Sequence, residues 1–197
     1  MTEPTRSGGT GGRRWRRALP VPADVVDRVR RETDLGRRVR VLAGARADDG
    51  TWVLGTRDAL VLVPGAGAPV VRPWETVESA SWDRDEAALV VREVGGYGEV
   101  RPEHTFAMEE PGVLLELVRE RVTASVVLQR HTPVTGRAGF TVIARRAPRG
   151  DGDPRWMFAF DPGVDPADPE VRAAARTALA AACAEVGADP GAAAARI

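Results

Sequence analysis

The stretch VRVLAGARADDGTWVLGTRDALVLVP, residues 39–64, decides the fold of this chain. Apolar side chains recur at every second position from Val39 to Ala47, and this alternation is typical of a half-buried β-strand. Asp48-Asp49-Gly50 then provides a hairpin turn, because glycine tolerates the positive φ that such turns require. Residues 51–56 and 59–64 return as two further strands. The stretch therefore predicts an antiparallel meander.

The meander continues to residue 108 and is followed by an amphipathic helix. We predict further strands at residues 70–74, 77–82, 88–94 and 104–108, the first two forming a bent or bulged pair around Pro73. The helix runs from Pro111 to about Leu128. Its apolar stripe is wide enough to cap the open end of a small curved sheet. A short helix from Ala23 to Thr33 precedes the sheet.

A second unit follows the helix. Strands are predicted at residues 139–146 and 155–160, and Asp168 is the expected N-cap of a helix that ends at Gly187. The sequence therefore predicts an α+β protein in four parts. These are a disordered basic arm (1–20), a helix with a curved sheet and its capping helix (21–130), a ββα extension packed on that unit (131–190) and a frayed tail (191–197).

Three short motifs in the first unit resemble those of a known family. They are Val41-Leu42-Ala43, Gly55-Thr56-Arg57-Asp58-Ala59-Leu60 and Trp74-Glu75-Thr76-Val77. Residues 39–127 resemble bacterial pleckstrin-homology-like (PH-like) domains, and the whole chain resembles uncharacterised actinobacterial proteins of similar length. The resemblance implies a curved antiparallel sheet, or partly open barrel, capped by a helix. It implies no single function, since such domains bind very diverse partners.

One departure from the family pattern concerns lipid binding. Phosphoinositide-binding members of the family carry basic residues on the first hairpin, whereas the corresponding tip here is the acidic Asp48-Asp49-Gly50. This difference argues against phosphoinositide headgroup binding at that place.

The charge balance excludes a general attraction to nucleic acids or to anionic membranes. The chain of 197 residues has 28 basic and 28 acidic residues, so its formal net charge is zero. The basic residues are all arginines. An exception to this balance is the arm, where Arg13-Arg14-Trp15-Arg16-Arg17 combines arginines with an aromatic ring that could stack on a base.

The sequence predicts a cytoplasmic protein without a transmembrane segment. Its single cysteine, Cys183, cannot form an internal disulfide and fits a reducing compartment. No apolar stretch reaches the roughly 18–20 residues that cross a membrane. The arginines at 13–17 are not followed by the apolar segment of an export signal.

No residue pattern indicates catalysis, a cofactor or a metal. His104 and His131 stand apart from each other and from Cys183, which lies in the middle of an alanine-rich helix rather than in the positive setting of a reactive thiol. The glycine runs at 8–12 and 95–98 lack the lysine and the spacing of a phosphate-binding loop. We therefore predict no catalytic, cofactor-binding or metal-ligating residue.

The candidate contact residues are Trp74, Arg119, Arg130, His131 and Arg145. Trp74, beside Pro73, is expected to be half-exposed. Arginines from position 119 to position 146 span the junction of the two units, and they would form an anion-binding patch if they converged there. The alternative is that they are independent surface arginines paired with nearby glutamates.

Three functions are compatible with these features. The first is a non-enzymatic, cytoplasmic binding or scaffolding protein whose partner is another protein. The second is a binder of, or enzyme for, an anionic small molecule at an arginine-lined junction of the two units. The third is weak nucleic-acid binding through the arm at residues 13–17.

Overall fold

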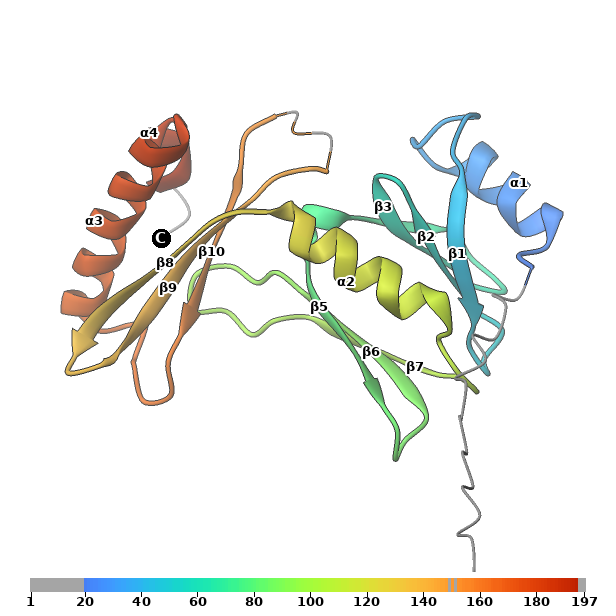
Figure 1. The fold of residues 1–197 in the computed structure, drawn as a ribbon, viewed down its shortest axis with the longest axis horizontal. Helices are drawn as coiled ribbons and strands as arrows, with labels where there is room; N and C mark the ends of the chain where they lie inside the picture. Colours follow the sequence, from blue (N-terminus) through green and yellow to red (C-terminus); the bar gives the residue numbers. More distant parts are fainter. Residues whose placement is uncertain (1–19, 149, 151, 195–197) are drawn as a thin grey trace, which may run out of the picture.

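The computed structural model describes residues 20–148, 150 and 152–194. The fold is α+β, with three antiparallel sheets and helices packed against them, and the sheets do not close into a barrel (Figure 1). Residues 1–19 of the predicted basic arm (1–20) and the last three residues lie outside the described part of the chain. Among the described residues, no helix has both the length and the apolar character needed to span a membrane.

The first sheet is the predicted meander. It contains β1 (Val41–Arg46), β2 (Trp52–Thr56), β3 (Ala59–Val63) and β4 (Val70–Pro73), which pair in that order. Gly50 adopts a φ of +88° in the first hairpin turn, where Asp49 Oδ1 accepts a hydrogen bond from Thr51 N at 2.8 Å. Helix α1 (Ala23–Glu32) packs against this sheet through the fully buried Val29.

The second sheet contains β5 (Val77–Asp83), β6 (Ala88–Glu93) and β7 (Glu103–Ala107). A short 3-10 helix, η1 (Trp74–Thr76), separates β4 from β5, so β4 pairs with β3 whereas β5 pairs with β6. The expected pairing of residues 70–74 with 77–82 is therefore wrong, because the chain changes sheets at η1. The two sheets meet at one corner, where Asp48 N donates to Ala107 O at 2.8 Å.

Helix α2 (Val113–Ser125) covers the inner faces of both sheets. Leu114, Val118 and Val122 join a buried cluster with residues of both sheets and of η1. Gly55 of β2 allows close contact, since a Cβ atom there would lie 2.5 Å from Leu117 Cδ2. The helix ends at Ser125, before the predicted end at Leu128, because Val126 already has an extended backbone.

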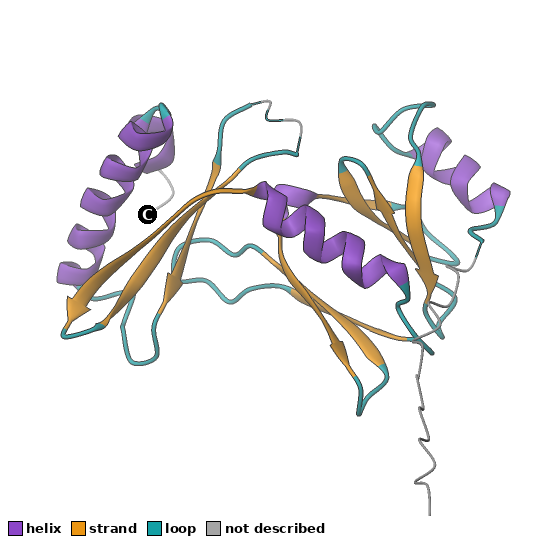
Figure 2. Cartoon of the chain, in the orientation of Figure 1, coloured by secondary structure: helices purple, strands orange, loops and turns teal. Residues whose placement is uncertain are grey.

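The second unit contains one strand more than the sequence predicts. Residues after α2 form β8 (Val126–Thr135), which pairs with β9 (Ala138–Arg145), and β10 (Arg155–Phe160) completes the sheet in the order β10-β9-β8. Helix α3 (Pro169–Val186) lies along one face of this sheet (Figure 2). The extension is therefore βββα rather than ββα. Where a frayed tail was expected, residues 190–194 form the short helix α4 (Pro190–Ala194).

The ends of α3 match the sequence prediction. Asp168 Oδ1 accepts a hydrogen bond from Glu170 N at 2.7 Å, and Gly187 ends the helix with a φ of +68°. The helix buries Val171, Ala175 and Leu179 against the aromatic residues of β9 and β10. The second unit thus has its own apolar core.

Candidate functional site

A groove lined by arginines lies on the first unit. Its volume is about 530 Å³, and it lies between the segment leading into β1, the β2–β3 turn and α2. Its lining consists of arginines, aliphatic residues and one aspartate: Leu35, Arg38, Val39, Arg40, Leu42, Arg57, Asp58 and Arg121. Four arginines therefore line one cavity, and Asp58 is the one acidic residue among the described residues that line it. We call this cavity the arginine groove.

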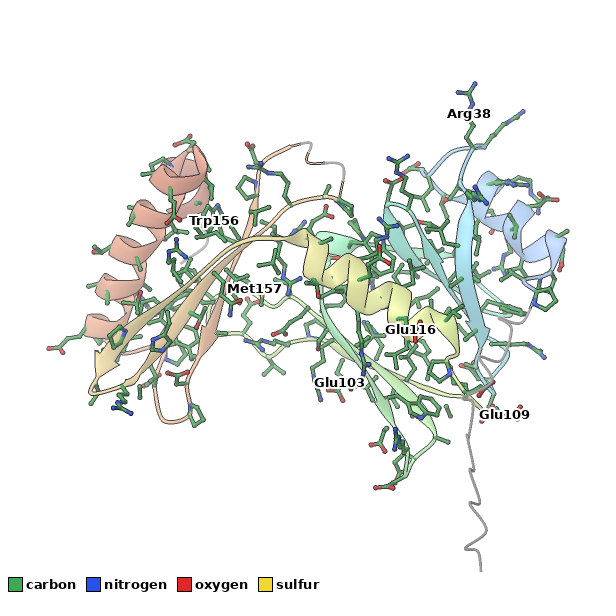
Figure 3. The ribbon with its side chains drawn as sticks, in the orientation of Figure 1. Arg38, Glu103, Glu109, Glu116, Trp156 and Met157 are labelled. Atoms are coloured by element: carbon green, nitrogen blue, oxygen red, sulfur yellow. The ribbon has the colours of Figure 1, made fainter. Side chains whose placement is uncertain are left out.

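The segment between α1 and β1 brings Arg38 and Arg40 to the groove. Thr33 Oγ1 donates to Val29 O at 2.7 Å, and Gly36 follows with a φ of +77° that redirects the chain. Val39 N then donates to Gly36 O at 3.1 Å. Figure 3 shows Arg38 projecting outward from this segment.

The β2–β3 turn fixes the position of Arg57. The Thr56 hydroxyl, which is buried, donates to Ala59 O at 2.8 Å and accepts from Ala59 N at 3.0 Å. The indole of Trp74 donates to Thr56 O at 3.2 Å, which ties the turn to η1. Arg57 is consequently an exposed side chain on a turn whose backbone is held in place by hydrogen bonds.

The arginines of the groove have few anionic neighbours. Arg38, Arg40 and Arg57 form no hydrogen bond or ion pair with any described residue. Arg121 Nη2 lies 3.8 Å from Glu120 Oε1, and its buried Nε has no hydrogen-bond partner within the described chain. Like charges that share a cavity repel one another, and a buried N–H without an acceptor costs free energy. A bound anion would reduce the repulsion among the arginines.

The chemistry of the groove suits an anionic ligand. A guanidinium presents paired N–H donors that match the oxygens of a phosphate or carboxylate. The aliphatic side chains of Leu35, Val39 and Leu42 line the same cavity, and Leu42 is 42% exposed. Among the described residues, the lining includes no serine, cysteine or histidine.

The structure does not bring the five predicted contact residues together. Trp74 is fully buried beneath α2, so the expectation of a half-exposed ring is wrong. Its position follows from η1, which turns the side chain into the core between the two sheets. Trp74 still supports the arginine groove indirectly through its hydrogen bond to Thr56. Arg119 lies exposed on α2.

Arg145 is buried at the junction of the two units and is only 5% exposed. Its Nη1 donates to Val77 O and Val122 O, both at 3.2 Å, and to Ser125 Oγ at 2.9 Å. Its Nη2 donates to Glu78 O at 3.1 Å. Burial lowers the pKa of the guanidinium, and the carboxylate of Glu78 opposes this effect. Arg145 therefore joins β9 to β5 and α2.

Arg130 and His131 have separate partners in the second unit. Arg130 forms an ion pair with Glu185 of α3. His131 Nε2 lies 3.0 Å from Asp161 Oδ2, which also accepts a hydrogen bond from Gly139 N at 2.8 Å. The hydrogen bond from His131, followed by that from Gly139, lowers the pKa of Asp161. These two side chains connect β8 to neighbouring elements.

The sequence prediction missed Arg38, Arg40 and Arg57 as site residues. The run Arg37-Arg38-Val39-Arg40 and the turn Thr56-Arg57-Asp58 were visible, but they lie far apart in the chain. Only the return of β2 beside β1 brings the turn close to the start of β1. Comparison with protein-family models, curated proteins and solved structures yields no match for this chain.

Proposed function

We propose that this protein is a non-enzymatic binding protein whose arginine groove binds a small anionic molecule carrying phosphate groups. The observation that supports it is the convergence of four arginines on one cavity, three of them without an ionic partner among the described residues. A cavity of about 530 Å³ is within the range of small-molecule sites, roughly 300–1,000 Å³.

We further propose that the first unit is a PH-like scaffold. A four-stranded sheet, a three-stranded sheet and a helix after the last strand, in that order, support this assignment. The acidic hairpin at Asp48 and Asp49 does not line the groove, so the proposed site differs from the first hairpin where lipid-binding members of the family carry their basic residues.

The cellular setting remains part of the proposal. We propose a cytoplasmic protein, and the single cysteine, Cys183, supports this because it is buried and unpaired. A protein partner is also proposed, with the small anion as a ligand that such a partner would sense. Binding of nucleic acid through residues 13–17 stays a prediction, since those residues lie outside the described chain.

The test is calorimetric titration of the full chain with pyrophosphate. We expect saturable binding, and we expect Arg57→Gln and Arg121→Gln each to weaken it about tenfold or more, because each removes a charge-assisted contact. Arg84→Gln is the matched control, since Arg84 is an exposed arginine on the β5–β6 turn and does not line the groove.

Two results would contradict the proposal. One is the absence of any binding of pyrophosphate or of nucleoside diphosphates by the wild-type chain. The other is equal weakening by Arg84→Gln and Arg57→Gln, which would indicate a general charge effect rather than a site.

A further inference from the structure

A second and smaller hollow lies where the first unit meets the second. Its volume is about 250 Å³. The chain between β6 and β7 forms one wall, β10 the second and α4 the third, with Gly95, Tyr97, Arg155, Trp156, Phe158 and Ala193 among the lining residues. Figure 1 shows the connections of the second sheet reaching across to the third sheet. None of these residues lines the arginine groove.

Tyr97 anchors the wall that comes from the first unit. Its hydroxyl donates to Pro166 O at 3.1 Å, and its ring packs edge-on against Phe158 and Phe160 with centroid distances of 5.1 and 5.2 Å. Edge-to-face pairs of this kind hold aromatic rings in a defined orientation. The wall is therefore fixed in position before any ligand enters.

Arg101 holds the other end of the same connection. Its Nη1 binds Glu78 Oε1 at 2.5 Å, and its Nη2 donates to Phe158 O at 3.4 Å. Gly95 lies against Arg101, since a Cβ atom there would be 3.3 Å from Arg101 Cγ. The connection thus spans both units, and the hollow is part of a packed interface rather than a gap beside a free loop.

The walls and the rim of the hollow differ in chemistry. Tyr97, Trp156 and Phe158 supply aromatic surface. Trp156 and Phe158 are nearly buried, with exposed fractions of 8% and 7%. Figure 3 shows Trp156 and Met157 on opposite sides of β10, with Trp156 on the side of α3. Arg155 is exposed and forms no ion pair or hydrogen bond with a described residue.

The positive character of this region has further sources. The pKa of Tyr97 is raised by burial, the charges of Arg172 and Arg176 on α3 act in the opposite direction, and the single charge of Asp165 raises it. Both arginines are therefore close enough to Tyr97 to contribute positive potential near the hollow. Among the described residues, no carboxylate lines the cavity.

We propose that this hollow binds a small aromatic carboxylate, with its ring against the aromatic surface of Tyr97, Trp156 and Phe158 and its carboxylate on Arg155. The volume indicates the size of the ligand, because about 250 Å³ is half the volume of the arginine groove, and an apolar cavity of about 150 Å³ already holds a single benzene ring. The single guanidinium at the rim matches a single negative charge.

The test is titration of isotopically labelled full-length protein with benzoate, followed by the amide signals of Gly95, Gly96 and Ala193. We expect these signals to shift saturably with benzoate. Benzamide has the same shape without the charge, and we expect it to bind at least about tenfold more weakly. Arg155→Gln should weaken benzoate binding by a similar factor. Arg137→Gln, on the β8–β9 turn, should leave it unchanged.

Three outcomes would overturn the proposal. They are the absence of saturable shifts at millimolar benzoate, shifts confined to residues of the arginine groove, and equal binding of benzoate by the wild type and Arg155→Gln. Because ligand and residues differ from those of the groove, failure here leaves the pyrophosphate experiment unaffected.

Discussion

At the scale of single residues, Arg145 determines how the two units are held together. Replacing it by Met would leave the carbonyls of Val77, Glu78 and Val122 and the Ser125 hydroxyl without their buried donor. Buried acceptors that lose a charged donor are costly, so we expect Arg145→Met to lower the free energy of unfolding by about 2–4 kcal/mol. Urea denaturation followed by tryptophan fluorescence measures this difference.

The control for Arg145 is the exposed Arg137, whose replacement by Gln should change stability by less than about 0.5 kcal/mol. An unchanged urea midpoint for Arg145→Met would show that the junction does not depend on this guanidinium. Arg145→Lys should retain only part of the stability, because an ammonium cannot reach several divergent acceptors with a planar fork of donors.

A second residue, Asp161, makes the end of the second unit sensitive to acid. Its pKa lies below the usual 3.8, because the charged form accepts hydrogen bonds from His131 and from Gly139 N. A carboxylate whose folded pKa is depressed stabilises the fold above its unfolded pKa, and this contribution is lost as the pH falls through the folded value. We therefore expect the melting temperature to fall more steeply below about pH 4 in the wild type than in Asp161→Asn.

Asp153→Asn provides the matched control for this titration, since Asp153 is exposed and forms no hydrogen bond with another described residue. Melting temperatures measured from pH 2 to pH 7 would contradict the assignment if the wild type and Asp161→Asn had parallel profiles.

At the scale of elements, the pairing of β8 with β9 depends on a glycine. A Cβ atom at Gly139 would lie 2.0 Å from Thr132 O and 2.7 Å from Pro133 Cα, and both are backbone atoms that cannot rotate away. We expect Gly139→Ala to force the strands apart and to destabilise the protein by about 1–3 kcal/mol. Gly65→Ala is the control, because nothing lies within 4 Å of a Cβ atom there. Equal thermal stability of the two variants would refute this close contact.

The elements also show which parts of the fold the sequence could predict. The meander, the caps of α3 and the amphipathic α2 depend on local alternation, turns and capping residues, and they were predicted. Strand β8 was missed because Pro133 is tolerated only where no ladder N–H is required, and β8 is an edge strand with irregular register at that point. The change of sheet at Trp74 depends on long-range packing that local periodicity does not encode.

For the site, the same distinction holds. A charged run such as Arg37-Arg38 is visible in the sequence, but its convergence with Arg57 and Arg121 requires the spatial position of a turn and a helix. The predicted junction arginines were identified by their place in the chain, whereas Arg145 turned inward and Arg130 found a partner on α3. Burial and pairing, which decide whether an arginine is available to a ligand, are properties of the fold.

At the scale of the whole molecule, the first unit carries opposite charges at its two ends. The acidic end contains Asp48 and Asp49, the β5–β6 turn and the residues before α2. Two backbone hydrogen bonds connect these segments, one from Asp48 N to Ala107 O and the other from Met108 N to Ala87 O. The arginine groove lies at the other end. Figure 3 shows Arg38 and Glu109 at opposite ends of this unit. A zero net charge therefore conceals a strong local asymmetry.

This asymmetry predicts that the protein binds an anionic matrix such as heparin at pH 7 and about 0.1 M salt. Clustered arginines attract anions locally, and screening beyond about 10 Å at 0.1 M salt removes the opposing effect of the acidic end. We expect combined replacement of Arg38, Arg40, Arg57 and Arg121 by Gln to lower the salt concentration required for elution, and deletion of residues 1–17 to leave this difference intact. If the deletion alone abolished retention and the four replacements had no effect, the anion-binding surface would be the N-terminal segment rather than the groove.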